Sequence, residues 1–360
     1  MRCATPTYAC WRTSGMKTYC LIAEESMAKA MTSETHPIDA VITWVDGNDP
    51  IHRQKRLAAL AKKSGESEIP IAAGRDDTRF QDNGELWYCI ASIRKFAPWI
   101  RYIHLVTDNQ IPSFLTSELM QEYRIRIVDH REIFRSFEWA LPTFNSRAIE
   151  TAMWRISELA PRFIYMNDDF LITKELYPDD FFSDRKVILR GTWRPIKKYD
   201  FFRIFINKKI NYFLKKFFGI TRTMHLYAQM RGAQLAGFQD NYYRSPHIPH
   251  PIYKKTLESF FKDNPYAFSK NISFKFRDMS QYWTVSLANH IEILNKNALL
   301  NPISTVLIIN GEYHSKNKIK KILHEVQLGQ VSFLCLGSLE KISYPVRKNI
   351  DKVLRNMLEI

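Results

Sequence analysis

The stretch FIYMNDDFLI, residues 163 to 172, joins two apolar runs through two adjacent carboxylates, Asp168 and Asp169. The first run has the composition of a buried β-strand. Two neighbouring carboxylates repel each other and resist burial unless water or a cation relieves the repulsion. The stretch therefore predicts a strand that ends in an acidic turn, solvated or bound to a cation.

The segments before this stretch alternate between strand and helix patterns. Strands are predicted over residues 39–45, 100–108, 125–130 and 162–167, and helices over residues 50–63, 83–97 and 146–159. Such alternation indicates an α/β fold with a mainly parallel sheet, a Rossmann-like core that carries helical additions. Ligands of these sheets gather beyond the carboxyl ends of the strands. Three strands end in acidic turns there, at Asp46 and Asp49, at Asp108, and at Asp168 and Asp169.

The chain divides into four parts on composition. We predict an N-terminal extension over residues 1–36, an α/β core over 37–183, a basic and aromatic helical insertion over 184–244, and a C-terminal part over 245–360 that completes the active site. The extension lacks the continuous apolar run of a signal peptide. The five cysteines form no CxxC pair, so neither a zinc site nor a disulfide scaffold is indicated, as is usual in a reducing compartment.

The charge balance indicates an anionic partner. The 360 residues include 52 basic and 37 acidic ones, a net charge of +15. Nucleotide phosphates, a polyanionic glycan, an acidic membrane surface and nucleic acid all satisfy that charge. No apolar stretch is long enough to span a membrane. The segment 201–218 suits a basic amphipathic helix on an anionic membrane, although packing of its aromatic side on the core explains the pattern equally well.

The acidic turn is the first candidate site. Oxygen ligands such as Asp168 and Asp169 suit Mg²⁺ or Mn²⁺, ions that also bind substrate phosphates. A solvated turn explains the pair equally well. The stretch TWVDGND, residues 43–49, is a second candidate, because a glycine-containing turn after a strand brings backbone N–H groups close to a ligand. It too is explained by a plain turn.

Two further groups of side chains could act on phosphate. In the first, Arg79 suits a phosphate, and Asp82, Asn83 and Glu85 supply polar groups at a helix start, where N-capping is the simpler explanation. In the second, the proline-stiffened loop PHIPHP carries His247 and His250, which suit general-base catalysis if they are not merely surface residues. Arg277 could supply positive charge to a phosphoryl group in transfer.

Four blocks of sequence together resemble the conserved regions of the Stealth family. They are IDAVITWVDGNDP, RFQDNGELWYCIASIRKFAPWIRYIHLVTDNQIPSFL, LPTFNSRAIETAMWRISELAPRFIYMNDDFLI, and PHIPHPIYKK with KFRDM downstream. The family comprises capsular and exopolysaccharide sugar-phosphate transferases and the animal lysosomal-enzyme N-acetylglucosamine-1-phosphotransferase. The resemblance implies a glycosyltransferase-A-like fold, a nucleotide-sugar donor and a divalent metal, Mg²⁺ or Mn²⁺.

The resemblance also implies roles for matched residues. Donor binding falls to Asp39, Trp44, Asp46 and Gly47 of the first region and to Arg79, Asp82, Asn83 and Glu85 of the second. The resemblance implies that Asp168 and Asp169 bind the metal. It implies that the catalytic residues are His247, His250 and Arg277. Residues 37–183 then bind the nucleotide-sugar and the metal. One departure concerns the fourth region, where Gly337 and Ser338 stand in place of the expected Asn and Asp.

From these features we expect a transferase that moves a hexose 1-phosphate from a UDP-sugar to a hydroxyl of a capsular polysaccharide or exopolysaccharide chain and releases UMP. We interpret the transferred group as an N-acetylhexosamine 1-phosphate. The alternatives are a metal-dependent glycosyltransferase that releases UDP, and a non-enzymatic basic protein that binds glycan or nucleic acid. We expect a cytoplasmic protein, peripheral on the inner face of the membrane, with no nucleic-acid partner.

Overall fold

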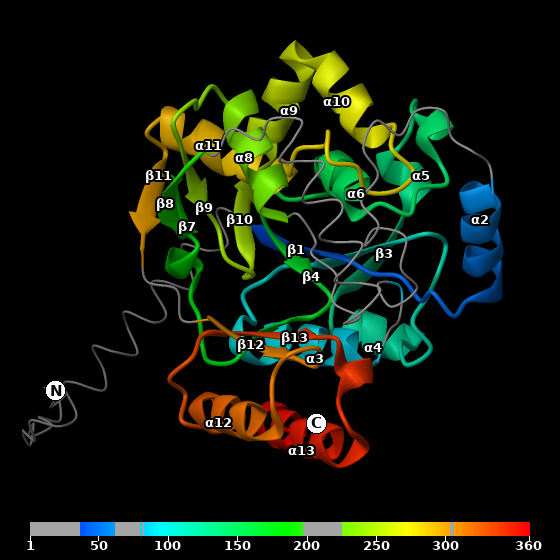
Figure 1. Ribbon diagram of the computed structural model, residues 1–360, viewed down its shortest axis with the longest axis vertical. Helices are drawn as coiled ribbons and strands as arrows, with labels where there is room; N and C mark the ends of the chain where they lie inside the picture. The colour runs from blue at the N-terminus through cyan, green and yellow to red at the C-terminus, as the bar shows by residue number, and fades with distance from the viewer. Residues whose placement is uncertain (1–36, 62–79, 81–82, 197–224, 303–305) are drawn as a thin grey trace, which may run out of the picture.

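A five-stranded sheet forms the centre of the molecule (Figure 1). The computed structural model describes residues 37–61, 80, 83–196, 225–302 and 306–360. The strand order is β10 (His250–Tyr253), β4 (Arg162–Asn167), β1 (Ile38–Thr43), β2 (Ile103–Thr107) and β3 (Ile125–Asp129). All neighbours pair in parallel except β10 with β4. The predicted α/β class with a mainly parallel sheet is confirmed.

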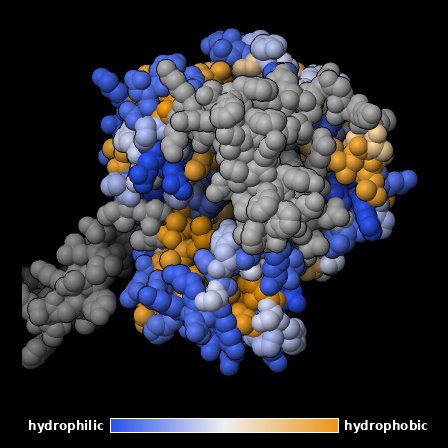
Figure 2. All heavy atoms as spheres, viewed as in Figure 1, coloured by the Kyte–Doolittle hydropathy of each residue, from blue (hydrophilic) through white to orange (hydrophobic). Residues whose placement is uncertain are grey.

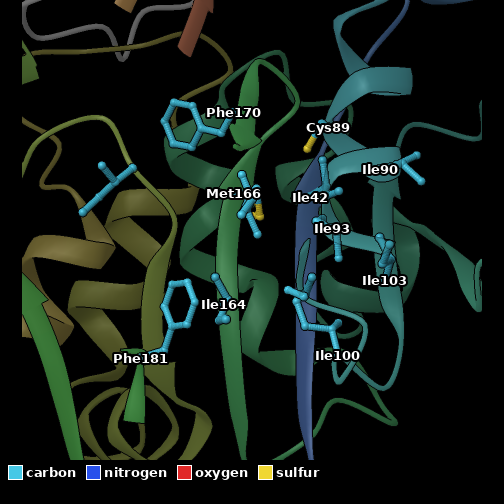
Figure 3. Close-up of a cluster of buried hydrophobic side chains, with 14 of the residues drawn as sticks. Ile42, Cys89, Ile90, Ile93, Ile100, Ile103, Ile164, Met166, Phe170 and Phe181 are labelled. Carbon is cyan, nitrogen blue, oxygen red and sulfur yellow. The ribbon is translucent and has the colours of Figure 1, made fainter. Parts of the chain in front are cut away.

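Both faces of this sheet are buried, which explains why its strands are apolar almost throughout. On one face, Ala40 and Ile42 of β1 pack with α3 (Glu85–Phe96); Figure 3 shows Ile42 beside Cys89, Ile90 and Ile93 of that helix. On the other face, Val41 packs with α6 (Ser146–Ala152), α9 (Lys254–Asp263) and α11 (Thr284–Leu294). Alternation of side chains along β1 therefore serves two cores.

The acidic turn joins two different sheets. β4 ends at Asn167, and β5 (Phe170–Ile172) pairs with β13 (Phe333–Gly337), which in turn pairs in parallel with β12 (Val306–Asn310). The helices α12 (Lys316–Gln327) and α13 (Tyr344–Leu358) pack on this small sheet through their apolar faces. The chain turns apolar again after Asp169 because it enters a second buried sheet, and this explains the unusual pattern of the stretch.

Smaller elements complete the fold. Two further sheets consist of β11 (Ala298–Asn301), β7 (Lys186–Arg190) and β6 (Phe182–Ser183), and of β8 (Thr192–Pro195) with β9 (Asn241–Arg244). The remaining α-helices are α2 (Pro50–Ala61), α4 (Ser117–Glu122), α5 (His130–Ile133), α8 (His225–Leu235) and α10 (Pro265–Ile272), and the 3₁₀ helices are Glu138–Ala140, Met153–Arg155, Pro178–Asp180 and Leu339–Lys341.

Two predicted helices differ in detail from the observed ones. The helix expected over residues 146–159 is α-helical only to Ala152 and then tightens into a 3₁₀ turn. α3 begins at Glu85 after Gly84, whose φ of 90° is the left-handed conformation that glycine adopts without strain. The described ends of the predicted helical insertion include strands β7, β8 and β9 as well as α8, while residues 197–224, including the predicted membrane helix, lie outside the described residues.

Candidate active site

Two neighbouring cavities meet at the acidic turn. A cavity of about 150 Å³ is lined by Asp168, and one of about 310 Å³ is lined by Asp169. Ser146, Asn167 and Arg277 line both cavities. The two adjacent carboxylates therefore face two adjoining spaces with a common wall, as a site that binds two parts of one ligand, or two ligands, requires.

The smaller cavity has an aromatic and neutral wall. Trp44 and Val45 enter it from the end of β1, and His52 meets the edge of Phe144 with ring centroids 5.2 Å apart. Burial lowers the pKa of His52, and it lowers that of His130, which also lines the cavity, to about 4. Both imidazoles are therefore neutral near pH 7, and the cavity suits a flat organic ring better than an anion.

The larger cavity is cationic on one side. Arg147 and Arg277 line it together, and burial lowers the pKa of both, that of Arg147 to about 9, so both stay charged at neutral pH. Glu150, on the same helix as Arg147, lies in the same cavity with its pKa raised by burial. Two guanidinium groups beside one enclosed space suit a phosphate or diphosphate.

The local sequence explains how Arg277 reaches this position. Asn145 caps α6, accepting a hydrogen bond from the Arg147 backbone N–H, and its side-chain amide donates to the backbone oxygens of Phe274 and Phe276. These bonds hold the segment before Arg277 against the start of α6. The Arg277 guanidinium then donates to the hydroxyl of Ser146. The capping residue Asn145 and its neighbour Ser146 thus position Arg277, a catalytic candidate that lies 131 positions after Ser146.

Three histidines also line the larger cavity. His225 stacks on His247 with ring centroids 5.0 Å apart, and both His225 and His250 meet the edge of Trp283. Burial lowers the pKa of His250 to about 3. Desolvation by the surrounding protein lowers the pKa of His247, and the charges of Arg244 and Arg277 lower it further. The two predicted histidines are thus brought together with Arg277, and both are neutral near pH 7.

Asp169 has an unsatisfied oxygen. Its Oδ2 accepts a hydrogen bond from the Cys335 thiol at 3.4 Å, but its Oδ1 is buried without a partner in the described part of the chain. Burial raises the pKa of Asp169 to about 6, and the thiol offsets that effect only in part. An orphaned, partly protonated carboxylate beside two arginine-lined spaces is the feature that a bound cation or ligand would satisfy.

The carboxylate pair fits a divalent cation only with help from a ligand. Within residues 37–61, 80, 83–196, 225–302 and 306–360, no group of three or more His, Cys, Asp and Glu side chains could hold a metal. Mg²⁺ and Mn²⁺ accept one or two carboxylates and take their other ligands from water and substrate phosphates. Asp168 and Asp169 are suited to such a partial ligand set.

The residues expected to bind the donor are spread over several places. Trp44 lines the smaller cavity. The Asp46 carboxylate accepts from the Asn48 backbone N–H and so serves the turn. Gly47 lies against Phe80, where an added Cβ would come within 2.3 Å of the Phe80 backbone oxygen, so packing explains this glycine. Asn83 bonds to Glu85 at the start of α3, beside a third cavity. Arg79 and Asp82 lie outside the described residues.

Asp39 lies at the other end of the sheet and lines neither cavity. It is fully buried and accepts hydrogen bonds from Arg101, His104 and the backbone N–H groups of Tyr102 and Ala160. Trp44 lies five positions further along the chain, about 16 Å at the rise of an extended strand. The structure therefore gives Asp39 a role in holding the strands together and separates it from the donor-binding position that the resemblance implied.

Several cavity residues had not been predicted as site residues. His225, Glu150, Asn310 and Tyr313 line the larger cavity. Arg147 and Glu150 follow a recognisable helix cap, and their spacing of three residues places them on one face of α6. His225, Asn310 and Tyr313 belong to elements far from the motifs in sequence, so only the tertiary fold brings them to the site.

The fold and site define an α/β protein with an anion-binding active-site candidate at the carboxyl edge of its sheet, and comparison with known proteins finds matches to two conserved family regions. Residues 36–64 match the model of Stealth protein CR1, conserved region 1, and residues 79–189 match that of Stealth protein CR2, conserved region 2. Two stretches of this chain therefore match conserved regions of the Stealth family. His247, His250 and Arg277 lie beyond these matched regions, so their family roles stay predictions.

Similar proteins include three bacterial phosphotransferases. Exopolysaccharide phosphotransferase cps2G of Lactiplantibacillus plantarum is 27% identical over 90% of this chain and 94% of its own length. Exopolysaccharide phosphotransferase SCO6021 of Streptomyces coelicolor is 44% identical over 41% of this chain and 25% of its own length. Capsular polysaccharide phosphotransferase fcs1 of Haemophilus influenzae is 39% identical over 44% of this chain and 41% of its own length. The chain thus spans nearly all of cps2G but less than half of the other two.

Solved structures that align with this chain include two glycosyltransferases. The galactosyltransferase LgtC, in complex with donor and acceptor sugar analogs, covers 89% of this chain and 95% of its own, with a TM-score of 0.41 and 13% identity. Mouse xyloside xylosyltransferase 1 covers 85% and 99%, with a TM-score of 0.35 and 11% identity. Of the helices described here, none combines the length and apolarity needed to cross a membrane.

Proposed function

We propose that this protein is a phosphotransferase of capsular polysaccharide or exopolysaccharide synthesis, which transfers a sugar 1-phosphate from a UDP-sugar to a hydroxyl of the growing glycan. The names of its bacterial relatives support the reaction class. The observation that carries the proposal is the pair of adjoining cavities, in which Asp168 and Asp169 face different spaces and Arg277 lines both. The donor nucleotide would occupy the smaller space, and its diphosphate the common wall.

In the proposed reaction an acceptor hydroxyl attacks the phosphorus that carries the sugar. A new O–P bond forms, the P–O bond to UMP breaks, and the hydroxyl proton moves to a base. Arg147 and Arg277 would bind the non-bridging phosphate oxygens and stabilise the negative charge of the transition state. Asp168 and Asp169 would hold Mg²⁺ or Mn²⁺, which when bound neutralises the carboxylates and polarises the diphosphate.

His247 is the better candidate for the general base. It is neutral at pH 7 because its pKa is lowered, and it keeps an exposed position in the larger cavity. His250 is buried, and a pKa of about 3 makes it a weak base. His250 would instead support the cavity wall through its contact with Trp283. On this assignment, replacing His247 affects proton transfer, and replacing His250 affects the shape of the site.

The decisive experiment identifies the nucleotide released. The purified protein is incubated with Mg²⁺, a panel of UDP-sugars and short capsule-type acceptors, and the products are separated by chromatography. Release of UMP with a new phosphodiester is expected. Release of UDP would mean that the acceptor attacks the anomeric carbon of the donor sugar, which is glycosyl transfer, and would overturn the proposal. His247→Gln is the matched control, because it should remove most turnover while leaving donor binding by calorimetry unchanged.

A further inference from the structure

A third cavity, of about 470 Å³, lies between α3, α4 and α13. Its lining combines Trp87 and Phe114 with the polar side chains of Asn83, Asp351 and Arg355. We propose that this cavity binds a segment of the acceptor glycan remote from the hydroxyl that reacts. The inference rests on the proposed function for the identity of the glycan, but it concerns residues outside the two catalytic cavities.

The aromatic wall is held in place before any ligand binds. The Trp87 indole stacks on Tyr123 with centroids 5.9 Å apart at an interplanar angle of 8°, and meets Phe114 at 5.5 Å. Trp87 and Phe114 are nevertheless half-buried, so each keeps accessible surface. A fixed aromatic ring offers a large contact area at low entropic cost, and the C–H faces of sugar rings pack on such surfaces.

The polar wall suits a phosphorylated glycan. Tyr88 donates a hydrogen bond to Asp351, and Arg355 Nε donates to the same carboxylate at 2.9 Å. The Arg355 side chain is 49% exposed, and a guanidinium held in this way presents its remaining N–H groups outward. Figure 2 shows the surface over α12 and α13 as largely hydrophilic. Asp351 and Arg355 are the only charged residues in the described part of the cavity lining, so the half-exposed guanidinium of Arg355, which Asp351 orients, is the group that would bind a phosphodiester of the glycan.

The cavity lies on the same edge of the molecule as the active-site candidate. α3 follows β1 and precedes β2 in the parallel sheet, so its first turns lie at the carboxyl ends of those strands. Cys89, next to Tyr88, donates through its thiol to the Asn167 backbone oxygen at 3.7 Å, and Asn167 lines both catalytic cavities. A glycan chain that leaves the catalytic cavities along this edge therefore meets the third cavity.

The test uses oligomers of N-acetylhexosamine joined by phosphodiesters, one and six repeats long, with maltohexaose as the neutral probe. Calorimetry on the full-length protein without UDP-sugar should show tighter binding of six repeats than of one or of maltohexaose. Arg355→Ala should weaken binding of the hexamer about 10-fold and leave binding of the single repeat unchanged. Trp87→Phe should weaken it less, with an unchanged melting temperature.

Lys352→Ala is the matched control, because it removes the same charge from the same helix outside the cavity. An equal loss in Lys352→Ala and Arg355→Ala would overturn the proposal in favour of diffuse charge, and equal affinity of wild type for one and six repeats would overturn it outright. Binding is measured without donor, so it does not depend on turnover. If the protein binds the hexamer more tightly through Arg355 but does not turn over any UDP-sugar, the glycan-binding role of this cavity stands and only the proposed function is refuted.

Discussion

Each end of the parallel sheet contains a buried carboxylate, and the surrounding protein shifts the pKa values of the two in opposite directions. At the amino end, burial of Asp39 opposes its ionisation, but hydrogen bonds from Arg101, His104 and the Ala160 backbone outweigh that effect and lower its pKa to about 2. At the carboxyl end, burial raises the pKa of Asp169 to about 6, and Oδ1 lacks a partner among the described residues. Asp39 stabilises the fold, whereas Asp169 is held in an unfavourable state.

The difference between the two carboxylates indicates that Asp169 is kept for function, at a cost in folding stability. Buried polar groups are normally satisfied, and an exception requires a reason. Asp39 is surrounded by partners from β2 and from the segment before β4, so its charge ties three strands together. Within the residues that the structure describes, Asp169 has the Cys335 thiol as a partner of Oδ2 only, and it lines a cavity together with arginines and histidines. Substitutions at the two positions should therefore separate stability from activity.

The largest effect is expected for Asp169→Asn. The amide keeps the shape but cannot supply a carboxylate to a cation, so kcat should fall at least roughly 10³-fold, about 4 kcal/mol in activation free energy. Since the folded-state pKa is raised, the charged form destabilises the fold above that pKa, and the melting temperature at pH 7.5 should be unchanged or higher. A large drop in melting temperature would show that Asp169 is structural, as Asp39 is.

Asp39→Asn should produce the converse result. Loss of the charge leaves Arg101 and the buried His104 without their carboxylate, which should cost about 3 kcal/mol in the free energy of unfolding. Urea denaturation measures this loss. Turnover per folded molecule should stay near that of wild type, because Asp39 lines neither catalytic cavity. Loss of turnover in folded Asp39→Asn protein would restore the donor-binding role implied by the resemblance.

Arg277→Lys tests the common wall of the two cavities. Lysine keeps the positive charge but lacks the planar fork that can bond Ser146 and a phosphate together, so kcat should fall about 10²-fold. Folding measured by circular dichroism should be retained. Arg347→Lys, a change of the same kind on α13 away from both cavities, is the control and should leave kcat unchanged.

The sequence predicts the sheet well and the site only in part, and Asp46 and Asp108 show why. Both follow parallel strands, as Asp168 and Asp169 do, yet Asp46 serves its own turn and Asp108 pairs with Lys55 at 3.0 Å. The positions of the parallel strands follow from local patterns, but short carboxylates are equally suited to turns and to ligands. Which of them faces a cavity depends on contacts such as Asn145 to Phe274, which join segments that are distant in sequence.

The smallest expected effect concerns acid stability, and it depends on the amino end alone. The folded-state pKa of Asp39 is about 2, below its unperturbed value of 3.8, so its ionised form stabilises the fold above pH 4. That contribution, about 2 kcal/mol, is lost as the pH falls from 4 to 2. Urea midpoints of wild type and Asp39→Asn should therefore converge over this range. Because Asp169 has a raised pKa, Asp169→Asn should follow the wild-type acid profile there, and a convergence in that variant instead would reverse the roles of the two carboxylates.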